Sequence, residues 1–507
     1  MGYAISIPFV VLLAIFAYRA PSPSASGIID PDYYWHLSYG DWIIQNGRLP
    51  TEDFWSWTFD GHAYRLTQWL GEVAMAFANQ MGGTLGTSTL SALLLTLTLA
   101  ASYKAARCFL DNRLAALAVS IGCNAILVSL ACRPHQFTHL GLAILTWMVA
   151  SFQTTGNHRP LYFVPVLMAI WVNLHGGYAV GLAYLWMMTG LVVVDAFVSK
   201  RPDEIRTVAI PLAIAAAIGT LSTLLNPYGW EAWVYAFEIA SLKSSAAGIV
   251  DEWAATSIKT EVGLNFFLIT SAMFVAMAAA RQRPRIAQLL AAVALCAIGW
   301  SAVRISLMST ILIVPILASA LRSTSFYDLA FNGDGRRYDR LIPLPVAVGV
   351  LAALATLTVW LGQIDQTAAR HVTANMPEQE VRFMQAHHIE GRILNAPEAG
   401  GYLIRKLGQK VSLDTRLDLY GDRALFEYLF ARRGEVGWRE YIERMNPDVV
   451  LINNQAALRQ LLSGDGKYRL VFEGAAYSIL LKASMRLDIP TVFTDLHNNP
   501  FLSQLKS

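Results

Sequence analysis

Residues 286–321 read IAQLLAAVALCAIGWSAVRISLMSTILIVPILASAL, and Arg304 is the only charged residue among them. A helix rises about 1.5 Å per residue, so this run would extend about 54 Å as one helix, whereas the hydrocarbon core of a bilayer is about 30 Å thick. The stretch therefore predicts two membrane-spanning helices. The break between them is expected near Arg304, just after Gly299-Trp300-Ser301.

The composition of the whole chain agrees with a membrane protein. Of the 507 residues, 55% are hydrophobic and 15% are charged, whereas a soluble domain carries about 25% charged residues. This balance excludes a disordered chain, a fibrous chain and an ordinary soluble enzyme. The formal net charge is only +3, so the charge gives no indication of a nucleic-acid partner.

Further apolar stretches are candidates for membrane-spanning helices, because a span needs about 20 apolar residues. Together with the run above they make eleven, near residues 4–19, 84–103, 114–131, 137–154, 160–174, 178–198, 207–225, 263–280, 286–303, 305–321 and 342–363. A weaker run at 69–81 is expected to lie along the membrane surface or to be re-entrant, because counting it as a span would spoil the charge pattern of the loops.

Lys and Arg in the short loops indicate the orientation, because cytoplasmic loops are enriched in them. If the N-terminus is cytoplasmic, the loops on that side carry twice as many Lys and Arg as those opposite. The cytoplasmic set is Lys104, Arg107, Arg113, Arg159, Lys200, Arg201, Arg206, Arg281, Arg283, Arg285, Arg322, Arg336, Arg337 and Arg340. The outer set is Arg19, Arg48, Arg65, Arg133, Lys243, Lys259 and Arg304.

Most of the polar chain falls on the outer side. It comprises the first outer loop (20–83), the fourth outer loop (226–262) and the tail (364–507). The tail is long enough for one soluble domain. Its predicted elements are a helix at 377–388, a strand at 392–395, a helix after Gly400-Gly401, and strands at 410–413, 448–452 and 468–482. We therefore predict a membrane module (1–363) and a small α/β domain (364–507).

Two acids, Asp30 and Asp32, open the first outer loop just beyond a span and are followed closely by His36. A carboxylate at this boundary can activate an acceptor or hold a divalent cation against a phosphate. Asp32 and His36 are the candidate metal ligands, although the pattern requires no cofactor. The alternative is a helix cap, since Asp before a helix caps it well.

Basic side chains near the predicted span ends form a second candidate group. Arg304 would suit a phosphate or pyrophosphate, because its planar fork binds such oxygens bidentately; the alternative is a snorkelling side chain at a helix end. His175 follows a short predicted span, so we expect it below the membrane surface, in a cavity shared with His135 and Asp32. A polar residue at that depth is functional by default, and the alternative is a hydrogen-bonded turn.

Several common catalytic motifs are absent from the sequence. There is no P-loop, no nucleophile elbow, no HExxH and no pair of CxxC motifs. Their absence counts against an ATP-driven pump with its own motor, a serine hydrolase and a zinc protease.

These segments together resemble the GT-C superfamily of polytopic membrane glycosyltransferases, and more closely a group of bacterial membrane proteins within it. In that group a segment of the type Asp-x-Asp-x-Trp-Trp-His-Leu opens the first outer loop, and Tyr34 here replaces the first Trp. The resemblance extends along nearly the whole chain. It includes Gln68-Trp69-Leu70, Glu72, Arg133-Pro134, Trp171-Val172-Asn173-Leu174-His175-Gly176, Leu225-Asn226-Pro227-Tyr228-Gly229-Trp230, Glu252-Trp253 and Asp414-x-Arg416-x-Asp418-x-Tyr420-Gly421.

The same loop also resembles that of the oligosaccharyltransferase catalytic subunit, over its beginning only. The second acidic motif of that enzyme and the tryptophan-rich acceptor motif of its tail are absent here. An Asn-linked sequon acceptor and a metal requirement therefore do not carry over.

The resemblance implies a GT-C-like α-helical polytopic protein of the bacterial inner (plasma) membrane, with a cytoplasmic N-terminus and a periplasmic tail domain. It would move a sugar from a polyprenyl-phosphate-linked donor to a glycan, lipid or protein acceptor on the non-cytoplasmic face. An acid of the first outer loop, Asp30 or Asp32, would be catalytic. From their positions we expect the donor phosphate to bind Arg304, His175 and Arg133. Further candidates are His36, His135, Asn173 and Glu72.

Three other functions remain open from the sequence. A transporter or flippase for a lipid-linked substrate would show inverted repeats and broken mid-membrane helices, and no convincing repeat is visible. A polysaccharide polymerase or ligase would depend on Arg and His more than on paired Asp. A non-catalytic assembly protein would depend on its tail and not on the acids.

Overall fold

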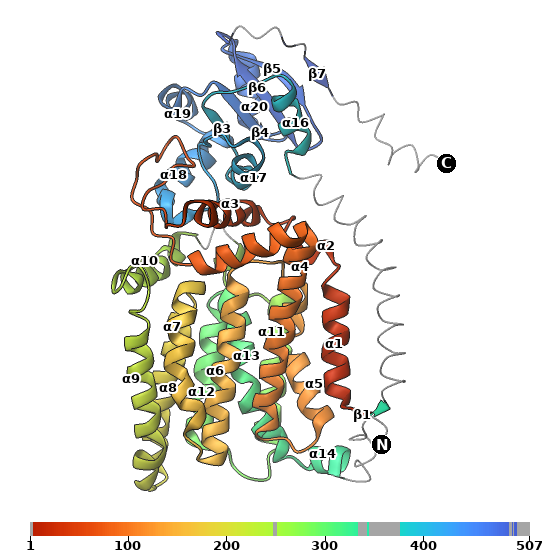
Figure 1. Cartoon of the computed structure of the whole chain (residues 1–507), viewed down its shortest axis with the longest axis vertical. Coiled ribbons are helices and arrows are strands. Elements are labelled where there is room, and N and C mark those ends of the chain that lie inside the picture. The colour runs from red at the N-terminus through yellow and green to blue at the C-terminus, as the bar shows by residue number, and fades with distance from the viewer. Residues whose placement is uncertain are drawn as a thin grey trace. The chain divides into compact units, whose positions relative to one another are not determined.

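The computed structural model describes residues 4–246, 251–332, 342–343, 376–485, 489 and 491–493. Its internal contacts divide the chain into two compact units (Figure 1). Unit 1 comprises Met1–Ser26 and Thr67–Gln363, and unit 2 comprises Gly27–Leu66 and Ile364–Ser507. Most of the first outer loop therefore groups with the tail, whereas the boundary that we predicted at residue 363 kept this loop in the membrane module.

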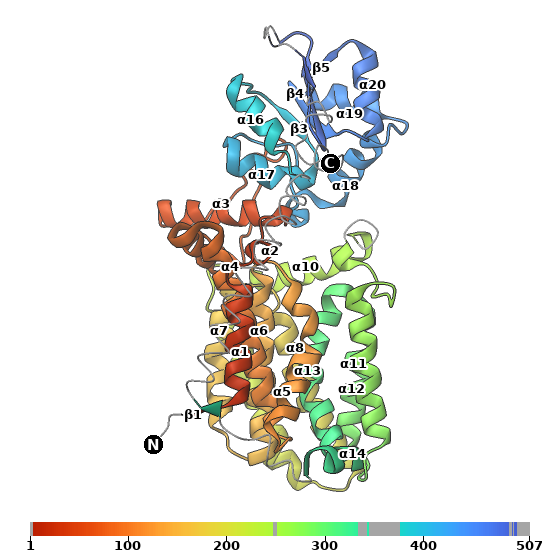
Figure 2. The same cartoon turned by 90° about the vertical axis from the view of Figure 1, so that its right-hand side faces the viewer.

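Unit 1 is built from helices that run back and forth (Figures 1 and 2). They are α1 (Ile7–Arg19), α2 (Pro23–Ser26), α4 (Trp69–Arg107), α5 (Arg113–Cys123), α6 (His135–Thr155), α7 (Val164–Leu174), α8 (Tyr178–Val198), α9 (Ile210–Ser222), α10 (Glu231–Ala246), α11 (Glu261–Ala278), α12 (Ile286–Trp300), α13 (Val303–Arg322) and α14 (Ser325–Tyr327). Short 3₁₀ or π turns are η1 (Ala125–Ser129), η2 (Arg159–Phe163), η3 (Ile205–Ala209), η4 (Asp251–Trp253) and η5 (Asp328–Asn332). Strand β1 (Ala4–Ile5) pairs with β2 (Ile342–Pro343).

Five helical stretches of the described chain are long and apolar enough to cross a membrane. They are α4, α8, Ile205–Ser222, α11 and α13. The apolar helices α1, α5, Arg159–Leu174 and α12 are shorter. The described chain thus has the helices of a membrane protein, but eleven spans are not shown, and the candidate at 342–363 lies largely outside the described residues.

The helix break expected from the sequence is present, and α4 contains a second break. The apolar run 286–321 divides where α12 ends at Trp300 and α13 begins at Val303, with extended backbone at Ala302 (φ −162°). Helix α4 is interrupted by non-helical backbone at Gly82 and Gly83, which separates the weak run 69–81 from the long apolar part of the helix. The predicted break near Arg304 is therefore confirmed.

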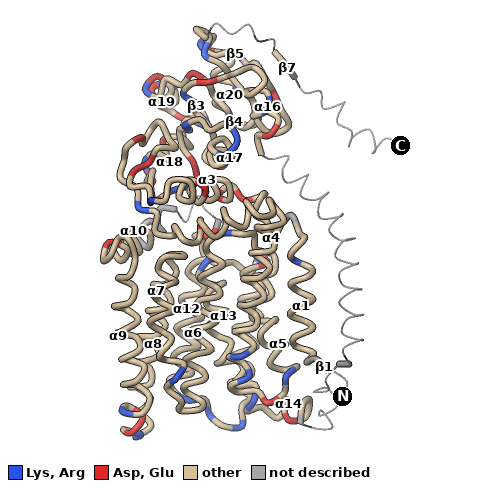
Figure 3. The backbone as a smooth tube through the Cα atoms, viewed as in Figure 1, with Lys and Arg blue, Asp and Glu red and all other residues tan. Residues whose placement is uncertain are grey.

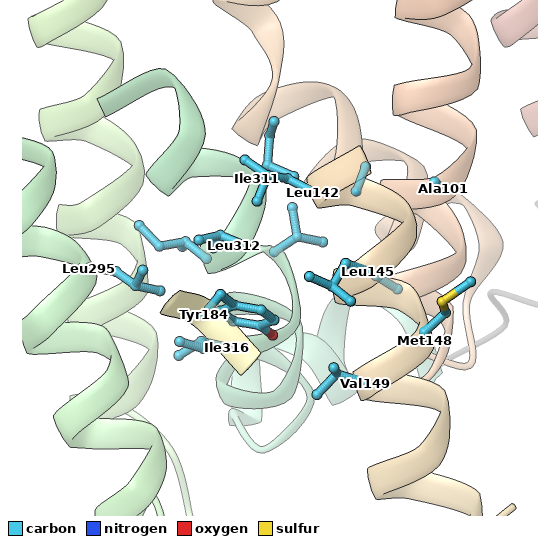
Figure 4. Close-up of a cluster of buried hydrophobic side chains, with 14 of the residues drawn as sticks. Ala101, Leu142, Leu145, Met148, Val149, Tyr184, Leu295, Ile311, Leu312 and Ile316 are labelled. Carbon is cyan, nitrogen blue, oxygen red and sulfur yellow. The ribbon is translucent and has the colours of Figure 1, made fainter. Parts of the chain in front are cut away.

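The core of unit 1 is a cluster of buried hydrophobic side chains, which includes residues of α4, α6, α8, α12 and α13 (Figure 4). Leu142 and Leu145 of α6 lie here with Tyr184 of α8 and Ile311 and Leu312 of α13. The helices also carry large apolar side chains that are exposed, among them Ile170, Ile214, Leu268, Val275 and Val293. Extensive apolar surface of this kind fits a lipid environment.

Positive charge is unevenly distributed over unit 1. Figure 3 shows Lys and Arg gathered at the end of the helices where α14 lies. Ion pairs join the loops there: Arg285 pairs with Asp195 (3.2 Å) and with Glu204, and Arg322 pairs with Asp111 (3.1 Å). The opposite ends of the helices carry the candidate residues of the predicted outer side.

Unit 2 combines helices with a five-stranded sheet. Its helices are α3 (Pro31–Asn46), α16 (Glu378–Ala386), α17 (Pro397–Leu407), α18 (Leu417–Arg432), α19 (Trp438–Met445) and α20 (Ala457–Asp465). The strands are β3 (Ile393–Asn395), β4 (Val449–Asn453), β5 (Tyr468–Glu473), β6 (Tyr477–Lys482) and β7 (Val492–Phe493), in the order β3-β4-β6-β5-β7. β3 is parallel to β4, and β5 and β6 form an antiparallel hairpin.

The tail combines helices with a small sheet, as predicted, but α18, α19, α20 and β7 were not among the predicted elements. Two of the predicted details also differ. Residues 410–413 form no strand of their own, because only Val411 bridges its neighbours Ser56 and Ile393. Gly400 and Gly401 lie inside α17 and do not open it. A Cβ on Gly401 would stand 2.8 Å from the carbonyl oxygen of Pro31, so this glycine permits close packing of α17 on α3.

Candidate functional site

Asp30 caps helix α3. Its backbone is extended (φ −97°, ψ 124°), Pro31 occupies the first helical position, and its Oδ1 accepts the backbone N–H of Asp32 at 2.9 Å. This is the geometry of an N-cap. The helix-cap interpretation is therefore confirmed for Asp30, and Asp32 becomes the stronger candidate of the two acids.

Asp32 lies in the first turn of α3, and its Oδ1 is held by two donors. The Thr415 hydroxyl donates to Oδ1, and the Trp35 indole Nε1–H approaches the same atom at 3.3 Å. Trp35 Nε1 also lies 3.1 Å from Thr415 Oγ1. The carboxylate is thus oriented by its own helix and by the tail, a contact that our sequence analysis did not anticipate.

Thr415 is itself held by a buried ionic network on its two neighbours. Arg416 is wholly buried and donates to Asp53 Oδ1 (2.8 Å) and to both oxygens of Asp414. Burial alone would lower the pKa of Arg416, and Asp414 together with nearby tyrosines raises it well above its usual value. Tyr39 and Tyr420 accept further bonds from the guanidinium.

This network joins two parts of the chain that are far apart in sequence. Tyr39 and Asp53 belong to the first outer loop, while residues 414–420 belong to the tail. The tail motif Asp414-x-Arg416-x-Asp418-x-Tyr420 thereby gains a structural explanation. Because Asp414 and Arg416 are both held by hydrogen bonds, the backbone of Thr415 between them is fixed, and its hydroxyl is already positioned to donate to Asp32.

His36 is the remaining candidate in unit 2. It is buried, and its ring centroid lies 3.7 Å from that of Trp35. Asp32 and His36 were the possible metal ligands. Within the described ranges no group of three or more His, Cys, Asp and Glu is arranged to hold a metal ion.

In unit 1, two of the predicted phosphate ligands converge on one carboxylate. Arg133 Nη1 lies 2.6 Å from Glu252 Oε1, and Arg304 Nη2 lies 2.6 Å from Glu252 Oε2. The Arg304 guanidinium also lies over the Trp253 ring, 5.0 Å from its centroid. Glu252 was not among the predicted site residues. The sequence feature that could have indicated Glu252 is the Glu252-Trp253 pair in the fourth outer loop, which is part of the family resemblance.

Three histidines lie at the same end of unit 1. His175 follows α7, and its Nδ1 accepts the backbone N–H of Gly177 at 3.1 Å, so the neutral ring carries its proton on Nε2. His135 and His139 sit one turn apart on α6, with ring centroids 5.2 Å apart. Arg133, Arg304 and His175 are close enough to His135 to act on it electrostatically. His139 was not predicted.

Asn173 and Glu72, two further candidates, make contacts within unit 1. Asn173 accepts the Trp69 indole N–H (2.9 Å) and donates to the carbonyl oxygens of Ala169 and Leu225. Its amide therefore ties the start of α4 and the segment after α9 to α7. Glu72 is completely buried in α4, where Gln68 Nε2 lies 3.5 Å from its Oε1.

The candidate residues thus fall into two sets. Asp30, Asp32 and His36 belong to unit 2, whereas the basic candidates with Glu72 and Asn173 belong to unit 1. No protein-family model matches the chain, and no curated protein matches its sequence.

Proposed function

We propose that the protein is a membrane glycosyltransferase that moves a sugar from a polyprenyl-phosphate-linked donor to an acceptor hydroxyl on the non-cytoplasmic face of the bacterial inner membrane. The observation that carries the proposal is the orientation of Asp32. A general base must be held in one direction to accept a proton from an acceptor, and Thr415 and Trp35 fix one oxygen of this carboxylate. The acceptor belongs to a glycan, a lipid or a protein.

The proposed reaction is a displacement at the anomeric carbon. The acceptor oxygen forms a bond to this carbon as its proton passes to Asp32. The bond from the carbon to the phosphate oxygen breaks, and the lipid phosphate leaves with the electron pair. Arg133 and Arg304 would stabilise the negative charge on the leaving phosphate, since guanidinium groups bind such oxygens in pairs. Their convergence on Glu252 supports this role, because it shows that both can bind one anion.

Chemical analysis of cells tests the proposal. Lipid-linked sugars and surface glycans are measured by mass spectrometry in a deletion strain complemented with the wild type, Asp32→Asn, Asp30→Asn or Asp60→Asn. Asp60 is the matched control, because it is a half-exposed carboxylate of the same loop that pairs with Lys410. We expect the deletion and Asp32→Asn to accumulate the same polyprenyl-linked sugar and to lack the same glycan residue.

The two other variants sharpen the test. Asp30→Asn should retain activity, because Asn caps a helix as well as Asp, and Asp60→Asn should match the wild type. If Asp32→Asn matched the wild type while the deletion had a phenotype, the carboxylate would be structural. Transport or assembly would then replace catalysis as the function.

A further inference from the structure

The carboxylate of Glu252 lies where an anionic ligand of Arg133 and Arg304 would bind. Each of its oxygens takes one guanidinium, at 2.6 Å in both cases. This is the arrangement in which two arginines clamp one phosphate, with a side chain of the protein in the place of the ligand. The two arginines come from distant parts of the sequence, since Arg133 precedes α6 and Arg304 lies in the first turn of α13.

We infer that Glu252 is a built-in competitor of the phosphate group, which holds the two arginines in place until a phosphate-bearing ligand displaces it. The inference rests on the proposed function for the identity of the ligand, the phosphate of a polyprenyl carrier. A phosphate monoester or diphosphate offers more acceptor oxygens and more charge than one carboxylate, so it can replace Glu252 on the same donors.

The surroundings of Glu252 allow this exchange. Its side chain is 37% exposed and that of Arg304 is 23% exposed, so a ligand can reach both. The backbone beyond Glu252 is fixed to the turn between α12 and α13, because Val303 N donates to Ala254 O (3.0 Å) and Thr256 N donates to Trp300 O (3.2 Å). Release of the arginines therefore needs only rotation of the Glu252 side chain.

Arg304 remains positioned when Glu252 withdraws. The Trp253 ring lies beneath the guanidinium and provides a cation–π contact of the kind that holds Arg in one plane. The Glu252 carboxylate thus determines how tightly a ligand must bind to displace it, while the Trp253 ring keeps the Arg304 guanidinium in its orientation. A ligand must exceed the affinity of Glu252 for the pair, which favours phosphate groups over carboxylates.

Binding to the purified full-length protein in detergent tests the inference. The probes are a polyprenyl phosphate, the polyprenol of the same chain length and inorganic pyrophosphate. We expect Glu252→Gln to tighten polyprenyl phosphate binding by roughly tenfold, because the competing charge is gone. Arg304→Gln and Arg133→Gln should weaken it by a similar factor. Glu261→Gln, which removes an exposed carboxylate at the start of α11, should leave it unchanged.

The outcomes separate this inference from the proposed function. If Glu252→Gln bound the phosphate probe no more tightly than the wild type, while its thermal stability was unchanged, the competitor role would be refuted. Loss of the gain in the double variant Glu252→Gln/Arg304→Gln would confirm that both act on one anion. Equal tightening for pyrophosphate would show that the phosphate group alone suffices, and tightening only for the lipid would show that the chain is also required. Wild-type transfer by Asp32→Asn would refute Asp32 as the catalytic base and leave this binding result standing.

Discussion

At the scale of single residues, the most informative contact is the one between Thr415 and Asp32. The two lie 383 positions apart in the chain, and no local pattern in the sequence relates them. In the proposed function Asp32 would touch the substrate, and Thr415 would be a positioning residue that acts through it.

Substitution of Thr415 should separate hydrogen bonding from packing. Thr415→Val keeps the shape of the side chain and removes the donor, so we expect the rate of sugar transfer to fall roughly 10–100-fold with little change in KM. Thr415→Ser restores the hydroxyl and should restore most of the rate. The measurement is the turnover of the accumulated donor by purified variants. Equal losses in the Val and Ser variants would show that only packing matters.

The buried Arg416 network should dominate the stability of unit 2. Arg416→Leu leaves Asp53 and Asp414 buried without their counter-charge, which costs about 3–5 kcal/mol. Lys410→Gln breaks an ion pair that also joins the loop to the tail, but both of its side chains are about half exposed, and such pairs contribute about 0–1 kcal/mol. Hydrogen exchange in α18 of the full-length protein should therefore accelerate strongly only in Arg416→Leu. Similar exchange in the two variants would contradict this explanation.

At the scale of elements, the packing of α16 on the β5–β6 hairpin buries a carboxyl group. Glu380 lies in the first turn of α16 and is 2% exposed, and burial raises its pKa to about 7. An acid whose pKa is higher in the folded state than in the unfolded state favours folding while it stays protonated. Its stabilising contribution is complete below the unfolded value of 4.5 and is lost as the pH rises towards 7.

A neutral side chain should remove this dependence. We expect unit 2 of the wild type to be less stable at pH 8 than at pH 4.5, with a contribution from Glu380 on the order of 3 kcal/mol. Glu380→Gln should flatten that part of the profile. Thermal unfolding of the full-length protein, followed by tryptophan fluorescence, provides the comparison. An unchanged pH profile in Glu380→Gln would show that the carboxyl does not titrate in this range.

At the scale of the whole molecule, the distribution of charge predicts which ends of the helices face the cytoplasm. Asn157 follows α6 at the basic end and is exposed, while Val436 is fully exposed between α18 and α19. Asn157 and Val436 are replaced by Cys, one at a time, in a variant that lacks Cys108, Cys123, Cys132 and Cys296. In spheroplasts an impermeant maleimide should label Val436→Cys directly and Asn157→Cys only after permeabilisation. The reverse pattern would overturn the orientation.

The sequence predicted those features of the fold that depend on local length and periodicity. The break before Arg304 follows from a run too long for one bilayer crossing. In the tail, the sequence indicated α16, β3, β4 and the region of β5 and β6, but it did not indicate α18, α19 or α20. Residues 410–413 resemble a strand in sequence, but only Val411 finds partners. Gly400 and Gly401 were expected to precede a helix, but they lie inside α17, where Gly401 packs closely against Pro31 of a distant segment.

The candidate sites could be predicted only in part, since they depend on contacts between distant segments. The sequence marked Arg133 and Arg304 separately, but their shared partner Glu252 belongs to a different loop. It marked Asp30 and Asp32 together, and the local cap geometry then distinguishes them. Asp414, Arg416 and Tyr420 were recognised as a motif, whereas their packing around Asp53 required the structure.

The proposed role of Asp32 as the base for sugar transfer from a lipid-linked donor can be examined in one reconstitution. Lipids from the deletion strain, which should contain the accumulated donor, are mixed in liposomes with acceptor membranes and with purified wild type or Asp32→Asn. We predict that the wild type consumes the donor and releases the polyprenyl phosphate, while folded Asp32→Asn leaves the donor intact. Equal consumption by both proteins would contradict the assignment of Asp32 as the catalytic base.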